Sequence, residues 1–241
     1  MKNEVTPYQT EASKKDQVRS MFDNIAGRYD LLNRILSFGV DVWWRRAAVR
    51  KLKTYKPNHV VDIACGTGDF SLAVHKAGVP KVTGVDIAEE MLVVGRNKIK
   101  IKGLEPNITL VNGDAENLQF EDSTFDGATV AFGVRNFQDL KAGLIDIKRV
   151  LKPGAPLIVL EFSKPKVFPV KQLYNFYFKT ICPFVGRLIS GDGRAYTYLY
   201  ESVHVFPDGD DFLEVMKSCG YSKLSCKKYT FGICSMYTGV C

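Results

Sequence analysis

Residues 60–70, which read VVDIACGTGDF, constrain the fold of this chain more than any other stretch. The largely apolar residues 60–63 predict a buried strand. Gly66 and Gly68 then turn the chain into a helix that is expected to begin near Phe70, because glycine lets the backbone approach a ligand without a Cβ clash. A strand, a glycine turn and a helix N-terminus together form the nucleotide cradle of open α/β sheets. Gly-x-Gly alone is a weak signal, so the interpretation needs a second element.

A carboxylate further along the chain supplies that second element. Residues 81–86, which read KVTGVD, predict a second strand that ends on Asp86. The spacing from Gly68 to Asp86 is close to the offset of about 20 residues at which an acid binds the ribose of a nucleotide. The two stretches together indicate a nucleotide site rather than a plain α/β turn.

The charges around the glycine turn bear on which nucleotide binds. A dinucleotide site usually has a third glycine, where this chain has Ser71. Asp62 and Asp69 flank the turn, and two carboxylates there would repel a pyrophosphate. They favour a ligand that lacks phosphate and carries positive charge. S-adenosyl-L-methionine meets both conditions, since it joins adenosine to a sulfonium and an amino group.

Strands alternate with helices over most of the chain, which predicts an α/β fold with a parallel sheet and right-handed crossovers. The later elements continue this alternation of strands and helices. Expected strands are 108–112, 125–132 and 156–162, and expected helices are 71–77, 89–101, 140–151 and 208–218. Two last strands, 223–230 and 233–240, would close the sheet as an antiparallel hairpin. Ligands bind at the carboxyl ends of such strands, where Asp114 and Ala115 offer a carboxylate and a backbone N–H to adenine.

Two segments lie outside this alternation. N-terminal helices are expected over 16–55, where apolar residues recur every three or four positions. Aromatic residues crowd 164–207, which predicts a helical lid inserted after the fifth strand. That lid could line a hydrophobic tunnel, lie on a membrane surface, or only thicken the core. We expect 1–241 to form a single domain, since its length can bury a substantial core.

The net charge and the cysteines limit which binding partners and which cellular compartment we expect. The net charge is +7, but Lys and Arg form no run of five or more, so nucleic acid is not an expected partner. The six cysteines are scattered without metal-ligand spacing, so we expect no metal site. The chain begins without a secretory pattern, so we expect reduced thiols and a cytoplasmic protein. No apolar run is long enough to span a bilayer. Peripheral membrane contact and a homodimer are both compatible with the sequence.

An N-terminal signature resembles the ubiquinone/menaquinone biosynthesis C-methyltransferases. It consists of YDLLN at 29–33, LSFG at 36–39 and WRR at 44–46. The family usually has a histidine where this chain has Asp41. A second family signature resembles RVLKPGA at 149–155, in which Ala155 replaces a usual glycine, and it continues to EFS at 161–163. The resemblance covers nearly the whole chain from Val18 to Cys241.

The resemblance implies a fold, a cofactor and a set of cofactor contacts. The fold would be that of a class I S-adenosylmethionine-dependent methyltransferase: a Rossmann-like, mostly parallel seven-stranded sheet with the C-terminal hairpin and the helical lid. Family contacts to S-adenosyl-L-methionine match Thr67, Asp86, Asp114 and Ala115. With the two glycines of the turn, the expected cofactor-binding residues are Gly66, Thr67, Gly68, Asp86, Asp114 and Ala115.

The resemblance also implies the reaction, which is methylation of a ring carbon in a prenylated, demethylated quinol. Conversion of demethylmenaquinol to menaquinol is favoured; a ubiquinone-type benzoquinol or another apolar molecule is the alternative. Arg135, in the loop that leaves the fourth strand, is the candidate catalytic residue. A guanidinium stays protonated, so it would stabilise a phenolate or orient a water that accepts the ring proton. A solvated loop arginine is the competing interpretation.

Three other functions stay open on the residues alone. A nicotinamide-dependent oxidoreductase could use a similar sheet, although Asp69 and Ser71 oppose a pyrophosphate. A non-catalytic binding module could retain the cradle. A methyltransferase could also act on nucleic acid or a small polar molecule, which the aromatic lid disfavours.

Overall fold

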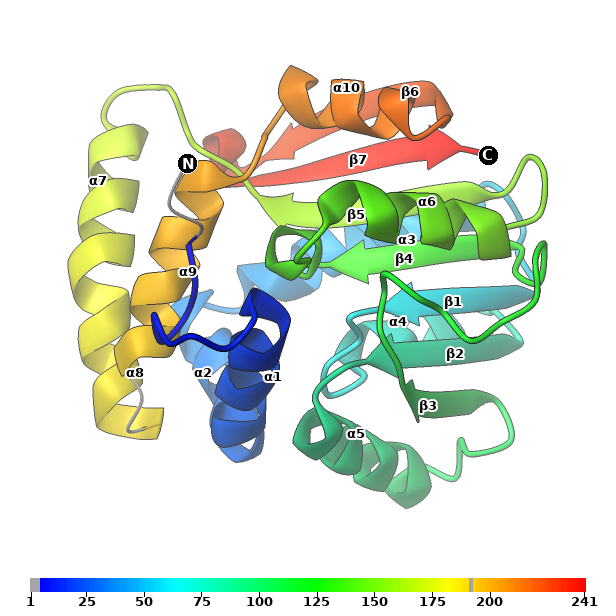
Figure 1. Ribbon diagram of the computed structural model, residues 1–241, viewed down its shortest axis with the longest axis horizontal. Coiled ribbons are helices and arrows are strands. Elements are labelled where there is room, and N and C mark those ends of the chain that lie inside the picture. The colour runs from blue at the N-terminus through cyan, green and yellow to red at the C-terminus, as the bar shows by residue number, and fades with distance from the viewer. Residues whose placement is uncertain (1–4, 191–192) are drawn as a thin grey trace.

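The computed structural model describes residues 5–190 and 193–241, and within them it forms a seven-stranded sheet in the order β3-β2-β1-β4-β5-β7-β6 (Figure 1). Its strands are β1 (His59–Ile63), β2 (Lys81–Asp86), β3 (Ile108–Asn112), β4 (Gly127–Ala131), β5 (Pro156–Phe162), β6 (Ser222–Tyr229) and β7 (Cys234–Val240). The first five pair in parallel, and β7 pairs antiparallel with both β5 and β6. The predicted α/β sheet with an antiparallel C-terminal hairpin is therefore confirmed.

The local backbone conformation determines where the strands end. β3 and β5 begin and end at the predicted residues, whereas β4 is shorter than the expected 125–132. Phe125 forms an isolated bridge with Leu151 before β4 begins. Phe132, just past its end, has a φ of 61°, in the left-handed region that strands do not use. The chain therefore leaves the sheet sharply after Ala131, and the loop that follows carries Arg135.

Helices occupy the segments between strands, close to the predicted positions. The elements before β5 are α1 (Lys14–Ile25), η1 (Ala26–Arg28), α2 (Tyr29–Leu36), α3 (Val40–Lys53), α4 (Asp69–Lys76), α5 (Glu89–Ile101), η2 (Val134–Asn136) and α6 (Leu140–Val150). Those after β5 are α7 (Val170–Phe176), the π-helix η3 (Tyr177–Ile181), α8 (Cys182–Ser190), α9 (Gly193–Val205), α10 (Asp210–Ser218) and η4 (Thr230–Gly232). The Ser13 hydroxyl caps α1 by accepting the Asp16 N–H at 3.1 Å.

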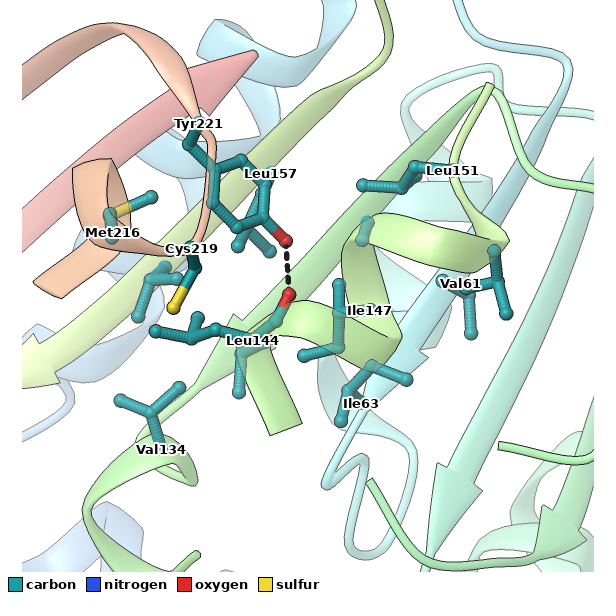
Figure 2. Packing of buried hydrophobic residues seen from close by; sticks show 14 of the residues in the cluster. Val61, Ile63, Val134, Leu144, Ile147, Leu151, Leu157, Met216, Cys219 and Tyr221 are labelled. Atoms are coloured by element: carbon teal, nitrogen blue, oxygen red, sulfur yellow. Dashed lines mark hydrogen bonds between the residues drawn. The ribbon is translucent and has the colours of Figure 1, made fainter. Parts of the chain in front are cut away.

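Two apolar clusters cover the two faces of the sheet. Successive side chains of a strand point to opposite faces, so Val61 and Ile63 pack against α6 and α10, whereas Val60 packs against α3, α4 and α5. On the α6 face the Tyr221 hydroxyl donates to the Leu144 carbonyl oxygen at 2.9 Å (Figure 2). This bond ties the start of β6 to α6 within the apolar layer.

The carboxyl ends of the parallel strands face α1, α2 and the helices α7–α9 (Figure 1). Apolar side chains of α1 and α9 share one cluster, which includes Met21, Ile25 and Tyr196. The segment predicted as a lid, 164–207, contains α7, η3, α8 and α9. None of the helices in the described part of the chain is long and apolar enough to cross a membrane. The helical segments thus cover the sheet edge where α/β proteins bind ligands.

Candidate active site

The turn after β1 has the geometry that its glycines predict. Gly66 and Gly68 have φ values of 54° and 77°, which favour glycine over any residue with a Cβ. The Gly66 N–H donates to Asp86 Oδ2 at 2.7 Å, so the end of β2 holds the turn of β1. α4 begins directly after the turn, at Asp69. The predicted strand, glycine turn and helix are therefore all present.

Asp86 is a buried carboxylate at the carboxyl end of β2. It accepts N–H groups from Gly66 and, at 2.9 Å, from Ala88. Burial raises the pKa of Asp86, and these backbone bonds oppose that shift. An ionised carboxylate offers about four lone-pair sites. Two backbone bonds therefore leave capacity for the hydroxyl groups of a ribose.

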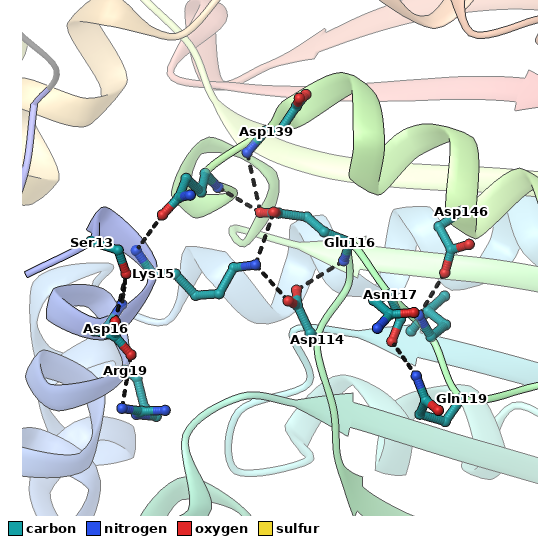
Figure 3. Close-up of polar contacts among 12 residues, drawn as sticks. Ser13, Lys15, Asp16, Arg19, Asp114, Glu116, Asn117, Gln119, Asp139 and Asp146 are labelled. Atoms are coloured by element: carbon teal, nitrogen blue, oxygen red, sulfur yellow. Dashed lines mark hydrogen bonds and ion pairs between the residues drawn. The ribbon is translucent and has the colours of Figure 1, made fainter.

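Asp114 and Ala115 line the same cavity as Gly66 and Asp86, at the end of β3. A cation already faces this edge of the cavity: Lys15 Nζ, on α1, lies 2.6 Å from Asp114 Oδ2 and 3.0 Å from Glu116 Oε2 (Figure 3). The cavity measures about 80 Å³, below the roughly 300–1,000 Å³ that is usual for ligand sites. The Lys15 side chain, which reaches across to both acids, helps to keep it small.

The charges of this cavity fit a cationic adenosine ligand without phosphate. Three carboxylates line it, from Asp86, Asp114 and Glu116. Among the described lining residues the one cation is Lys15, and two of those acids already pair with it. A pyrophosphate would meet uncompensated negative charge here. S-adenosyl-L-methionine instead has an amine and a sulfonium that suit acids.

Two predicted contacts, Thr67 and Gly68, lie outside the cavity lining. Thr67 is only 2% exposed, and its hydroxyl donates to Asp30 Oδ1 at 2.6 Å. Lys98 pairs with the same Asp30 and with Asp69 at 2.8 Å. Here the Thr67 side chain joins the glycine turn to α2, and its contact with a cofactor stays a prediction.

A second cavity, of about 630 Å³, lies between the N-terminal helices, the ends of β4 and β5, and α7–α9; we call it the chamber. Phe22, Tyr29 and Phe132 line both the chamber and the smaller cavity. Buried rings from the lid segment, such as Tyr174 and Phe178, line its other side. The chamber is thus large, mainly apolar and directly adjacent to the predicted cofactor cavity.

Arg135 lines the chamber and is not a solvated loop residue. Its side chain is 7% exposed, and its Nη1 lies 2.7 Å from Oε1 of the fully buried Glu161. The same Nη1 donates to the Phe132 carbonyl oxygen, and the guanidinium carbon lies 5.7 Å from the centre of the Phe162 ring. Its Nε has no hydrogen-bond partner within residues 5–190 and 193–241. The sequence suggested Arg135 but not its partner Glu161.

A second buried ion pair in the chamber was not predicted from the sequence. Asp41 is 5% exposed and accepts bonds from Ser37 Oγ at 2.6 Å and Arg45 Nη1 at 2.7 Å. All three residues line the chamber. The spacing of Asp41 and Arg45 on one helix was a visible signal, because residues four apart on a helix are neighbours. Nothing in the sequence indicated that this pair faces a cavity.

The comparisons place most of the chain in one family. The model of the ubiE/COQ5 methyltransferase family matches residues 10–241. A Bacteroides fragilis protein named demethylmenaquinone methyltransferase is 44% identical over 97% of this chain and 96% of its own length. A protein of the same name from Porphyromonas gingivalis is 43% identical over 98% and 97%. The Geobacter sulfurreducens ubiquinone/menaquinone biosynthesis C-methyltransferase UbiE is 42% identical over 98% and 92%.

Solved structures with low sequence identity share the fold. A SAM-dependent methyltransferase from Thermotoga maritima has a TM-score of 0.65 at 18% identity, over 92% of this chain and 98% of that one. Phosphoethanolamine N-methyltransferase 2 from Haemonchus contortus, solved with S-adenosyl-L-methionine, has a TM-score of 0.60 at 15% identity, over 82% and 52%. These likenesses support the architecture of a methyltransferase fold.

Proposed function

The chain belongs to the ubiE/COQ5 methyltransferase family, and from this premise we propose that it transfers the methyl group of S-adenosyl-L-methionine to a ring carbon of demethylmenaquinol, giving menaquinol. Family membership agrees with the resemblance of residues 29–46 and 149–163. It also disfavours a nicotinamide-dependent oxidoreductase and a non-catalytic binding module. The observation that carries the proposal is the shared wall of Phe22, Tyr29 and Phe132 between an acidic cavity and an apolar chamber.

The smaller cavity would hold the cofactor. The Asp86 carboxylate would accept the ribose hydroxyl groups, Asp114 the exocyclic amine of adenine, and the Ala115 N–H a ring nitrogen. When bound, S-adenosyl-L-methionine supplies an electrophilic methyl group. The protein contributes alignment of the two reactants and exclusion of water.

The chamber would hold the quinol. Its head group would lie near the shared wall, where Arg135 and Tyr29 place polar atoms among aromatic rings. Its prenyl chain would extend along the rings of the lid, including Tyr174, Tyr177 and Phe178. An apolar chamber suits a substrate that is almost entirely hydrocarbon apart from two oxygens.

We assign to Arg135 the role of raising the electron density of the quinol ring. Its guanidinium would hydrogen-bond a quinol oxygen and favour the phenolate, which raises the electron density of the neighbouring ring carbon. Glu161 holds Nη1 in place, and the free Nε can reach a ligand in the chamber. Arginine stays protonated, so a water molecule oriented by Arg135 would accept the ring proton.

The test is incubation with methyl-labelled S-adenosyl-L-methionine and demethylmenaquinol under a reductant. We expect label on the ring carbon of the reduced substrate and none on the oxidised quinone, because the quinone ring is too electron-poor to attack. Equal labelling of both forms, or label on an oxygen, would refute the proposal. A ubiquinone-type benzoquinol belongs in the same assay, because the name of the Geobacter sulfurreducens relative includes ubiquinone. We expect the naphthoquinol to react faster.

The exposed apolar side chains of the lid would contact a membrane beside the chamber, which Leu173 and Phe176 also line. Leu173, Phe176 and Phe184 are exposed on α7 and α8, and Lys171 and Lys179 are exposed on the same segment. Apolar side chains flanked by lysines suit the interface of an anionic bilayer. Such a contact would let a prenylated substrate pass between the bilayer and the chamber.

Vesicle flotation tests this surface. We expect binding to vesicles with anionic lipid and loss of binding in a variant that carries Leu173→Ser, Phe176→Ser and Phe184→Ser. Ile101→Ser is the matched control, because Ile101 is exposed at the far end of α5. If the same triple change instead converts a dimer to a monomer, as read by light scattering, the face is a homodimer interface and the membrane proposal is wrong.

A further inference from the structure

The chamber contains two guanidinium groups, each held by its own buried carboxylate. Arg135 pairs with Glu161, and Arg45 pairs with Asp41, both at 2.7 Å. In each case the partner contacts Nη1 and leaves Nε buried without a hydrogen-bond partner in the described part of the chain. Buried N–H groups are nearly always satisfied in folded proteins. Two unsatisfied guanidinium Nε–H groups on residues that line one cavity therefore point to a ligand with two acceptors.

Arg45 is held rigidly on α3. Asp41 accepts Nη1, and Ser37 fixes Asp41 from the other side at 2.6 Å. The neighbouring Trp44 anchors the helix, since its Nε1 donates to Thr230 Oγ1 at 2.9 Å. Asp69, the next acid, lies 3.9 Å from Nη1 and does not reach Nε. The Nε–H is therefore a preorganised donor rather than a mobile side-chain end.

A buried ion pair is weak evidence of stability, because removing two charges from water offsets most of their attraction. The Asp41–Arg45 pair lies among apolar and aromatic lining residues. Packing alone would be served as well by hydrophobic side chains of similar volume. The pair therefore calls for a role toward the contents of the chamber.

The positive charges of both guanidinium groups affect the pKa of Tyr29, a residue in the wall that the chamber shares with the cofactor cavity. Burial raises the pKa of Tyr29, and the positive charges of Arg45 and Arg135 both oppose that shift. Tyr29 lines both cavities. Arg45 and Arg135 line the chamber together with Tyr29, beside which the head group is proposed to lie.

A hydroquinone carries two oxygens on opposite sides of its ring. If Arg135 takes one oxygen, the other would be buried among apolar groups unless a second donor faces it. We infer that Arg45 binds the second hydroxyl oxygen of the quinol, as a positioning and specificity-determining residue; this inference rests on the proposed function. The Arg45 side chain would thereby favour a reduced para-diol over a ring with one oxygen.

The test compares two probes, 1,4-naphthalenediol and 1-naphthol, by anaerobic calorimetry without cofactor. A hydrogen bond to a charged group corresponds to about 10- to 100-fold in affinity. We expect wild-type protein to bind the diol more tightly than the mono-ol by that factor. In an Asp41→Asn/Arg45→Met variant, which leaves no lone buried charge, the ratio should fall to about one. Arg45→Lys, which keeps the charge but not Nε, should also lower it.

Arg46→Met is the matched control, because Arg46 is an exposed neighbour on the same helix. It should keep the wild-type ratio. An unchanged ratio in both Arg45 variants, or a wild-type ratio near one, would overturn the role of Arg45. Methylation of demethylmenaquinol by wild-type protein is read separately, so loss of the Arg45 role and failure of the proposed function give different results.

Discussion

Lys15 on α1 and Asp114 after β3, which both line the predicted cofactor cavity, form an ion pair at 2.6 Å (Figure 3). The neighbouring Lys14 Nζ donates to the carbonyl oxygens of Arg135 and Phe137, at 3.2 and 2.8 Å. The first turn of α1 is thus bound to both loops that border the cavity. If Asp114 binds the adenine amine as proposed, Lys15 must release the carboxylate or share it.

Replacement of Lys15 by Met should tighten cofactor binding. Lys15 would compete with adenine for Asp114, and partly exposed ion pairs are worth about 0.2–1 kcal/mol, so we expect about 1.4- to 5-fold higher affinity for S-adenosyl-L-methionine. Calorimetric titration measures the change, with Arg19→Met on the same helix as control. Weaker binding in the Lys15 variant would mean that Lys15 belongs to the cofactor site.

Asp86→Ala should weaken binding of S-adenosyl-L-methionine by about 1.5–3 kcal/mol, the range of a lost hydrogen bond to a charged group. Because the carboxylate also holds the Gly66 N–H, thermal unfolding without cofactor must accompany the titration. Asp86→Asn separates the effects, since its amide oxygen can still accept one backbone bond. Full affinity in both variants would remove Asp86 from the site.

Arg135→Ala should leave cofactor affinity unchanged and lower turnover by about 100-fold, as expected for loss of a group that stabilises developing charge. Glu161 would then be buried without its partner, so an Arg135→Met/Glu161→Gln variant serves as the folding control. Single-turnover rates with saturating quinol distinguish chemistry from binding. Normal rates in both variants would exclude Arg135 from the reaction.

Asp62 should make stability depend on pH. Burial raises the pKa of Asp62 to about 6, opposed by bonds from Ser71 and Thr129. The folded state therefore holds a proton that the unfolded state releases, so stability declines as pH rises from about 4 toward 6. Asp62→Asn should remove this decline, which amounts to at most about 3 kcal/mol. Urea unfolding of both proteins between these pH values checks it; parallel curves would contradict the assignment.

Local pattern was enough to predict the sheet. Alternating runs with clear turn residues identified β3 and β5 to the residue, and the glycine turn identified the end of β1. The shortened β4 depended on the backbone of Phe132, which composition does not reveal. Gly66, Asp86, Asp114 and Ala115 meet in one cavity because parallel strands end at one edge, a rule that the sequence can use.

Contacts between segments that lie far apart along the chain could not be predicted from the sequence. Thr67 carries the family pattern, yet its side chain faces Asp30 on α2. Lys15 meets Asp114 across 99 positions of sequence. Asp41 and Arg45 are four residues apart, the spacing of neighbours on a helix, but their position in the chamber depends on how the lid packs. Such contacts depend on tertiary packing, which the periodicity of apolar residues along the sequence does not reveal.

The most direct measurement of the central claim is a crystal structure with S-adenosylhomocysteine and demethylmenaquinol bound. We predict the adenosine at Asp86 and Asp114, and the quinol ring in the chamber beside Tyr29, with one oxygen on Arg135. An empty cavity under saturating ligand, or a quinol bound away from the wall formed by Phe22, Tyr29 and Phe132, would contradict the account.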